Sequence, residues 1–199
     1  MPNLLPLSAL LILFFNLSSA PKPELPEAKV SVHTGLLNEK EENAEFIPWV
    51  GDRPLTWEDF KCPPKRNTDA VASTSTSLGI AYHIKNYVLT YEITCNFSKT
   101  KSWGLIKTPY ILAHEQAHFD ITEIFARKLH KALMEYDFDQ STYKRDINSI
   151  YQRVVAEKEA FQAAYDKETD HSRNKRIQYE WLDQIDAILV DTEPYADYP

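Results

Sequence analysis

Two histidines and a glutamate, in the segment His114-Glu-Gln-Ala-His118, have the types and the spacing to bind and use a metal ion. On an α-helix, residues four apart lie about 40° apart in projection, so both imidazoles can face one point with Glu115 beside them. Zn²⁺ takes neutral imidazole nitrogens at about 2.0 to 2.1 Å, and a catalytic zinc keeps one position for water. Glu115 could accept a proton from that water as general base. The segment therefore predicts metal-assisted hydrolysis.

The alternative interpretation of these residues is an amphipathic helix whose two histidines are simply hydrogen-bonded. An accidental match of this kind is expected in about one chain per hundred of this composition. The placement favours the metal site, because both histidines fall on the apolar stripe of a helix that Thr108 would cap and Pro109 would begin. Buried imidazoles need partners, and a metal ion supplies one. The other members of that stripe are Ile111, Ile121, Phe125 and Leu129.

A third protein ligand has to come from another part of the chain. On the same helix, His130 lies sixteen residues beyond His114, which is about 24 Å along the axis. Asp120 and Glu123 point about 120° and 180° away from His114. Glu123 is expected to pair instead with Arg127, four residues later. The helix is therefore expected to supply only two ligands.

The favoured third ligand is His171, which lies in a predicted joint between two later helices. A chain that folds back there could bring this imidazole over the first helix, and Asp166 and Glu168 are the next candidates. His83, on the polar side of a predicted strand, is left open for a surface or cleft role. Tyr165 is a weaker candidate for steadying an oxyanion, because a phenol can donate to a developing charge.

Residues 1–20 have the pattern of a cleaved signal peptide. They are uncharged, their apolar run from Leu4 to Phe15 is too short to span a bilayer, and they end in the small residues Ser18-Ser19-Ala20. No Lys or Arg precedes the run, so an uncleaved anchor is the alternative. We expect cleavage after Ala20, export into the periplasm or the medium, and a flexible leader over 21–45, where Pro, Glu and Lys are frequent.

The composition indicates one globular domain over 46–190, followed by a loose tail over 191–199. The chain has 199 residues, of which 43% are hydrophobic and 26% charged. A net charge of -7 and a pI of about 5.4 favour neither nucleic acid nor an anionic membrane surface as partner. Cys62 and Cys95 are the only cysteines. In an oxidising compartment they are expected to form a disulfide, with two free buried thiols as the alternative.

The periodicity of the chain predicts two strands and three helices. Residues 73–84 and 87–97 alternate between polar and apolar, with Lys85-Asn86 as a hairpin turn. Neither Gly nor Pro occurs from Tyr110 to Glu193, and helices are predicted at about 109–135, 141–167 and 173–190. The prediction is an α+β fold, with a small antiparallel sheet packed on three helices and the histidines on the first long helix. The aromatic residues expected to join its core ahead of the strands are Trp49, Trp57 and Phe60.

Several separated segments together resemble one bacterial family. They are Leu55-Thr-Trp-Glu-Asp-Phe60, the Ser/Thr-rich strand ending in Tyr82, Ser102-Trp103, the run from His114 to Arg127, and Tyr165-Asp-Lys-Glu-Thr-Asp-His171. Over about residues 46–188 the chain is similar to domain of unknown function number 922, described as predicted secreted zinc-dependent proteases. Ser172 departs from the family pattern, in which Gly is expected at this position. The resemblance therefore does not fix the geometry of the turn that contains Ser172.

The resemblance implies an exported, zincin-like zinc metallopeptidase acting on proteins or peptides, with His114 and His118 as zinc ligands and Glu115 as base. The segment around His171 is compatible with a third ligand. By analogy with other zincins, the serine-rich strand could pair with an extended substrate. Two alternatives stay open, a metal-dependent hydrolase of a non-peptide bond and an exported binding or structural module with an inactive zinc site.

Overall fold

A computed structural model describes residues 45–65 and 68–199. The predicted signal peptide, residues 1–20, and all but the last residue of the predicted leader lie outside the described residues. Among the described residues, no helix combines the length and the apolar character that crossing a membrane requires.

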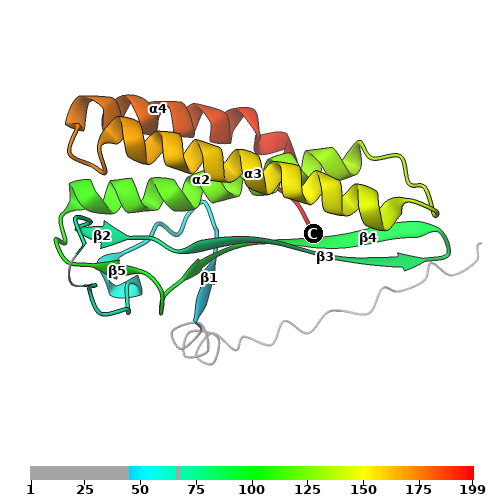
Figure 1. Ribbon diagram of the computed structural model, residues 1–199, viewed down its shortest axis with the longest axis horizontal. Helices are drawn as coiled ribbons and strands as arrows, with labels where there is room; N and C mark the ends of the chain where they lie inside the picture. Colours follow the sequence, from blue (N-terminus) through cyan, green and yellow to red (C-terminus); the bar gives the residue numbers. More distant parts are fainter. Residues whose placement is uncertain (1–44, 66–67) are drawn as a thin grey trace, which may run out of the picture.

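The fold is α+β, as predicted, with three long helices on one face of a small antiparallel sheet (Figure 1). The sheet has the strand order β1-β4-β3, and a second, two-stranded sheet joins β2 to β5. Helix α2 lies directly on the sheet, and α3 and α4 cover α2 from the other side (Figure 1). The strands are β1 (Phe46–Pro48), β2 (Ala72–Ser73), β3 (Thr76–Lys85), β4 (Val88–Ser98) and β5 (Trp103–Gly104). The helices are α2 (Pro109–Met134), α3 (Tyr143–Thr169) and α4 (Lys175–Asp191), with the short 3₁₀ turns η1 (Trp57–Asp59) and η2 (Glu193–Tyr195).

The β3–β4 hairpin follows the predicted alternation of buried and exposed positions. Leu78 and Ile93 face the helices, while Ser77 and Glu92 face solvent. The turn lies one residue later than predicted, at Asn86-Tyr87, where both residues have positive φ and the flanking Lys85 and Val88 pair. The predicted first strand is also broken, because the chain from Ser73 to Thr76 leaves its pairing with β5 before it joins β4.

Helix α2 begins where the sequence predicts. The Thr108 side chain accepts a hydrogen bond from the Ile111 backbone N–H (3.2 Å), and Pro109 occupies the first helical position, where no N–H is needed. The apolar stripe of α2 is almost fully buried between the sheet and the other helices. Trp49 and Trp57 pack against this core and Phe60 is part of it, as predicted.

Two predictions, the loose C-terminal tail and the disulfide, are wrong. Residues 191–199 are not loose, because Tyr198 donates a hydrogen bond to the buried Glu123 carboxylate (2.7 Å) and the Pro199 carbonyl accepts one from Ile93 (2.8 Å). The two cysteines are not bridged. Cys95 is buried on β4, whereas Cys62 is partly exposed and lines a surface cleft.

Candidate metal centre

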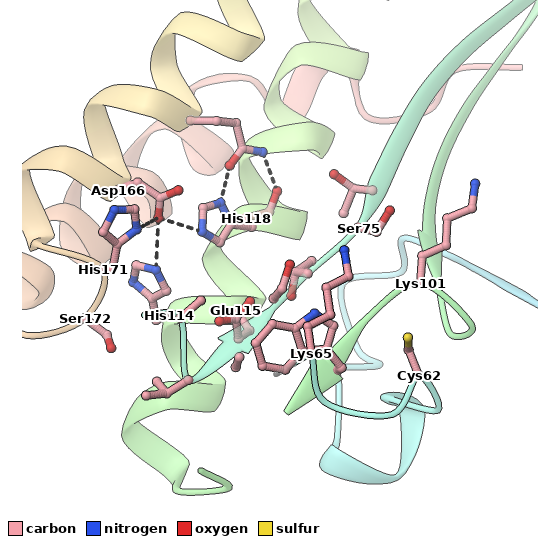
Figure 2. A pocket seen from close by; sticks show the side chains of 18 of the residues that line it. Cys62, Lys65, Ser75, Lys101, His114, Glu115, His118, Asp166, His171 and Ser172 are labelled. Atoms are coloured by element: carbon pink, nitrogen blue, oxygen red, sulfur yellow. Dashed lines mark hydrogen bonds and ion pairs between the residues drawn. The ribbon is translucent and has the colours of Figure 1, made fainter. Parts of the chain in front are cut away.

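Helices α2 and α3 bring two histidines and an aspartate together. His114 and His118 lie one turn apart on α2, and both direct their Nε2 atoms at Asp166 of α3 (Figure 2). The Asp166 Oδ1 atom is 3.2 Å from His114 Nε2 and 3.1 Å from His118 Nε2. Glu115, 4% exposed, lies beside them on α2.

These three residues fit a metal ion by their donor atoms and by their spacing. One ligand atom from each lies within 4.8 Å of the others. Two ligands at about 2.05 Å from a tetrahedral zinc ion are about 3.3 Å apart, close to both nitrogen–oxygen separations here. Two imidazoles and a carboxylate are a ligand set used at catalytic zinc sites. The cluster can therefore hold a metal ion.

Gln162 of α3 supports this interpretation by fixing the tautomer of His118. Its Nε2 donates to the His118 carbonyl oxygen (2.8 Å), so its Oε1 faces His118 Nδ1. Nδ1 then carries the proton, and the neutral ring directs the Nε2 lone pair at the carboxylate oxygen of Asp166. Two such acceptors repel unless a cation lies between them or a second proton occupies Nε2. Either a metal ion or an imidazolium satisfies this geometry.

The charges of the cluster are strongly coupled. Burial alone would raise the pKa of Asp166, but the hydrogen bonds from His114 and His118 outweigh it and hold that pKa below its ordinary value. Burial lowers the pKa of His118, and the hydrogen bond and charge of Asp166 raise it by more. The carboxylate therefore stays ionised over the whole physiological range, which suits a cation ligand.

Glu115 has the environment of a base. Burial raises the pKa of Glu115 above its ordinary value, partly opposed by the neighbouring His118 and His114 and by the hydroxyl of Thr74. Its Oε2 atom is buried and has no hydrogen-bond partner among the residues described. A carboxylate that is partly desolvated and free at one oxygen is able to take a proton from a nearby donor.

Tyr165 positions a ligand, and the prediction that it steadies an oxyanion is wrong. The side chain is completely buried, its ring stacks on that of His114 at 4.6 Å between centroids, and its hydroxyl faces the His114 carbonyl oxygen at 3.4 Å. Burial raises its pKa far above the ordinary value, so the phenol stays neutral. The hydroxyl does not line the cleft and therefore cannot reach a substrate there.

The other candidate ligands are less well placed than Asp166. The side chain of His171 is 60% exposed, and its Nδ1 lies 3.5 Å from Asp166 Oδ1, at the rim of the cluster. Glu168 is directed away, because its carboxylate accepts a hydrogen bond from Trp181 (2.9 Å). His83 is exposed on β3, outside the site. His171 as the third ligand stays a prediction, while the distances favour Asp166.

A tight turn after α3 holds His171 at the rim. Asp170, His171 and Ser172 have φ values of 48°, 50° and 69°, and the His171 N–H donates to the Asp166 carbonyl oxygen (2.9 Å). Positive φ at Ser172 explains why Gly is expected there, since Gly adopts this conformation without strain. Ser172 adopts this conformation here, and its carbonyl oxygen accepts a hydrogen bond from Tyr110 (2.8 Å).

A cleft of about 830 Å³ opens directly over the cluster. One wall is the segment around β2 and the start of β3, rich in Ser and Thr, and the other is formed by α2 and α3 (Figure 2). His114, Glu115, His118 and Asp166 all contribute to its surface. A substrate in this cleft would reach the proposed ligands and Glu115 together.

Gln162 is the residue of this centre that the sequence analysis missed. The one local signal for it is its place four residues before Asp166, which puts both side chains on the same face of α3. That signal has meaning only once α3 is known to pack on the histidine face of α2.

Comparison with known proteins identifies a family and nothing narrower. No curated protein and no solved structure gives a significant match to the chain. Residues 56–172 match the family described as "Bacterial protein of unknown function (DUF922)". The matched stretch is more than half of the chain, runs from η1 to the turn after α3, and contains every residue of the cluster. The chain therefore belongs to the DUF922 family, as the resemblance in its sequence predicted.

Proposed function

We propose that this protein is a zincin-like zinc metallopeptidase that hydrolyses peptide bonds. The observation that carries the proposal is the convergence of His114 Nε2, His118 Nε2 and Asp166 Oδ1 at the base of an open cleft, with the Glu115 carboxylate beside them. Among the metals that serve in hydrolytic enzymes, zinc is the one best suited to two imidazoles and one carboxylate. Three protein ligands leave a coordination position open, as catalysis requires.

In this proposal the side chains of the cluster divide the work. Zinc, when bound, supplies a Lewis acid for the peptide carbonyl and for the attacking water. His114, His118 and Asp166 hold the ion, and Glu115 accepts a proton as water attacks the carbonyl carbon and passes it to the departing amine nitrogen. Gln162 and Tyr165 keep the two imidazoles in place.

We further propose that the enzyme works outside the cytoplasm, in the periplasm or the medium, on protein or peptide substrates. The support for this is the apolar, uncharged N-terminal run that ends in Ser18-Ser19-Ala20. The acidic charge of the chain supports neither nucleic acid nor an anionic membrane as its substrate.

The decisive test replaces Glu115 with Gln. E115Q should keep about one zinc per chain, because Glu115 is not among the ligands, and should lose at least about 100-fold in kcat on any cleaved peptide. The measurement is metal content by elemental analysis together with a peptide-library digestion, with and without a chelator. The matched control is E157Q, at an exposed glutamate of α3 outside the cleft, which should behave as wild type. Full activity of E115Q, or purified protein that binds no zinc, would refute the proposal.

One observation favours a second candidate, a structural zinc site in a binding module. His171 lies 3.5 Å from Asp166, close enough for a small rotation to add it as a fourth protein ligand. Four protein ligands would leave no position for water, and zinc would then only tie the end of α3 to α2. X-ray absorption on the zinc-loaded protein separates the two, since the peptidase requires an oxygen donor from water in the first coordination shell.

A further inference from the structure

The cleft is divided by charge along its length, and its end away from His171 is cationic. The cluster end holds Glu115 and Asp166, whereas Lys65, Lys101 and Lys158 line the other part. Figure 2 shows Lys65 and Lys101 on the side of Glu115 opposite to His171. The chain as a whole is acidic, with a net charge of -7, so this end of the cleft differs in sign from the molecule.

Lys158 is the buried member of this cationic group. It is only 7% exposed and lies on the same face of α3 as Gln162 and Asp166, at intervals of four residues. Eight residues of helix separate it from Asp166, which is about 12 Å along the axis. Its ammonium pairs with Glu159 (2.9 Å), whose side chain is 65% exposed at the cleft surface. Holding an ammonium this deep is costly without a nearby anion, and the Glu159 carboxylate supplies that anion.

Lys65 and Lys101 belong to the other wall of the cleft, which the segments before β2 and before β5 form. Both are exposed, and within the described parts of the chain neither ammonium makes an ion pair or a hydrogen bond. None of the described residues that line the wall around them has a carboxylate. Its hydroxyl-bearing members include Thr68, Ser73, Ser75 and Thr100. The ammonium groups of Lys65 and Lys101 leave this end of the cleft with excess positive charge, because the one carboxylate among its described lining residues, that of Glu159, is paired with Lys158.

From this arrangement we propose that the cleft selects peptide substrates with an acidic side chain a few residues from the bond that is cut. An extended peptide advances about 3.3 Å per residue, so the 12 Å from Asp166 to Lys158 corresponds to three or four residues. Lys65 and Lys101 are the specificity-determining residues, because their charges are the ones that no carboxylate among the described residues neutralises. The proposal rests on the peptidase function proposed above.

The test compares K65E/K101E with wild type on matched peptides. A randomised decapeptide library first locates the cut site, and peptides with Glu, Gln or Lys at each flanking position then give kcat/KM. The wild type should prefer Glu over Lys about fivefold or more through KM, and this preference should weaken in 0.5 M salt and reverse in K65E/K101E. K85E, which makes a charge change at the exposed tip of the β3–β4 hairpin, should keep the wild-type preference.

A binding arm separates the failure of this proposal from the failure of the peptidase function. Fluorescence polarisation with the same Glu and Lys peptides on E115Q measures recognition without turnover. If wild type cleaves peptides without a charge preference, or if K65E/K101E keeps the preference for Glu, the cationic subsite is refuted. The peptidase function is not refuted by either result. Lysine-dependent binding of the Glu peptide without cleavage by wild type supports the subsite and refutes the peptidase. If the peptides are neither bound nor cleaved, both proposals are refuted.

Discussion

At the scale of one residue, His118 shows that a proposed metal ligand is oriented by neighbours that do not themselves bind the metal. Its Nε2 faces Asp166, its Nδ1 faces Gln162, and its backbone carbonyl accepts hydrogen bonds from Gln162 and Thr122. Its orientation is thus set by side chains from two helices. Ligand affinity should depend on these neighbours as well as on the imidazole itself.

Replacing Gln162 with Leu should weaken zinc binding by about 10-fold to 100-fold, because His118 loses the acceptor that holds its proton on Nδ1. Q162E should bind more tightly than Q162L, since it keeps an acceptor at Nδ1. Competition with a chromophoric chelator measures the affinities, and nitrogen NMR of the metal-free protein reports the tautomer. Q152L, at an exposed position on α3, is the control. Equal zinc affinity in Q162L and wild type would contradict the role of Gln162.

The choice between Asp166 and His171 as third ligand can be made with two variants. D166N should lose at least about 100-fold in zinc affinity, because it replaces a charged ligand by a neutral one of the same size. H171A should lose less than about 10-fold, because this imidazole is exposed at the rim and makes its contact through Asp166. Chelator competition gives both values. The reverse order would show that His171 is the third ligand, as the sequence predicted.

At the scale of the element, α2 has a second polar face that ties it to the N-terminal segment. The Asp120 carboxylate accepts hydrogen bonds from Trp49 and Gln116, both at 2.8 Å, and the Gln116 side-chain oxygen accepts one from the Leu55 backbone (2.7 Å). Gln116 and Asp120 therefore anchor the segment before β2 on the same turns that carry the histidines. Helix α2 positions the cluster because it is held on both sides.

Asp120 makes the stability of the protein depend on pH. Burial raises its pKa to about 6, against the hydrogen bonds from Trp49 and Gln116, and the charges of Asp186 and Glu123 add to the rise. A carboxyl whose pKa is higher when folded stabilises the fold below its unfolded pKa of about 3.8, and this contribution is lost as the pH rises through 6. D120N should therefore be more stable than wild type by about 3 kcal/mol at pH 7.5 and by little at pH 4.

Urea unfolding at pH 4, 5.5 and 7.5 measures this difference for the metal-free protein. D191N, at an exposed aspartate that ends α4, is the control and should show no such trend. A stability difference between D120N and wild type that stays constant with pH would contradict the raised pKa.

At the scale of the whole molecule, the two ends of the domain close over the far end of α2. Glu123 is buried and accepts hydrogen bonds from Arg127 (2.8 Å) and Tyr198 (2.7 Å), and Arg127 also donates to the Leu189 carbonyl (2.7 Å). The Arg127 guanidinium lies over the Trp49 ring at 5.2 Å. The C-terminal residues are thus part of the core network rather than an appendage.

Removing the Tyr198 hydroxyl from the Glu123 network should destabilise the domain without changing its affinity for zinc. Y198F leaves the buried Glu123 carboxylate with one hydrogen bond fewer, which should lower the free energy of unfolding by about 1 to 3 kcal/mol. Y179F, at a tyrosine that is 57% exposed, is the control. Urea unfolding and chelator competition are the measurements. An unchanged stability, or a zinc affinity that falls with it, would contradict this separation of network and site.

The sequence by itself determined the parts of this protein that depend on local geometry. Helical periodicity placed His114, Glu115 and His118 on one face, and Thr108 with Pro109 marked the start of that helix. The period-2 alternation gave the faces of the β3–β4 hairpin, and the i,i+4 rule gave the Glu123–Arg127 ion pair. Each of these relations spans fewer than about ten residues or follows a single repeat, so neighbouring residues are enough to specify it.

Only the tertiary structure decided which distant residues complete the site. Asp166 and His171 are five residues apart in sequence, yet the end of α3 places one between the imidazoles and the turn places the other at the rim. The partners of His118 and Glu123 come from Gln162 and Tyr198, which are 44 and 75 residues away. Helix packing sets these contacts through the shapes of whole faces, and no local pattern in the chain records which side chain a packed face will bring within 3 Å.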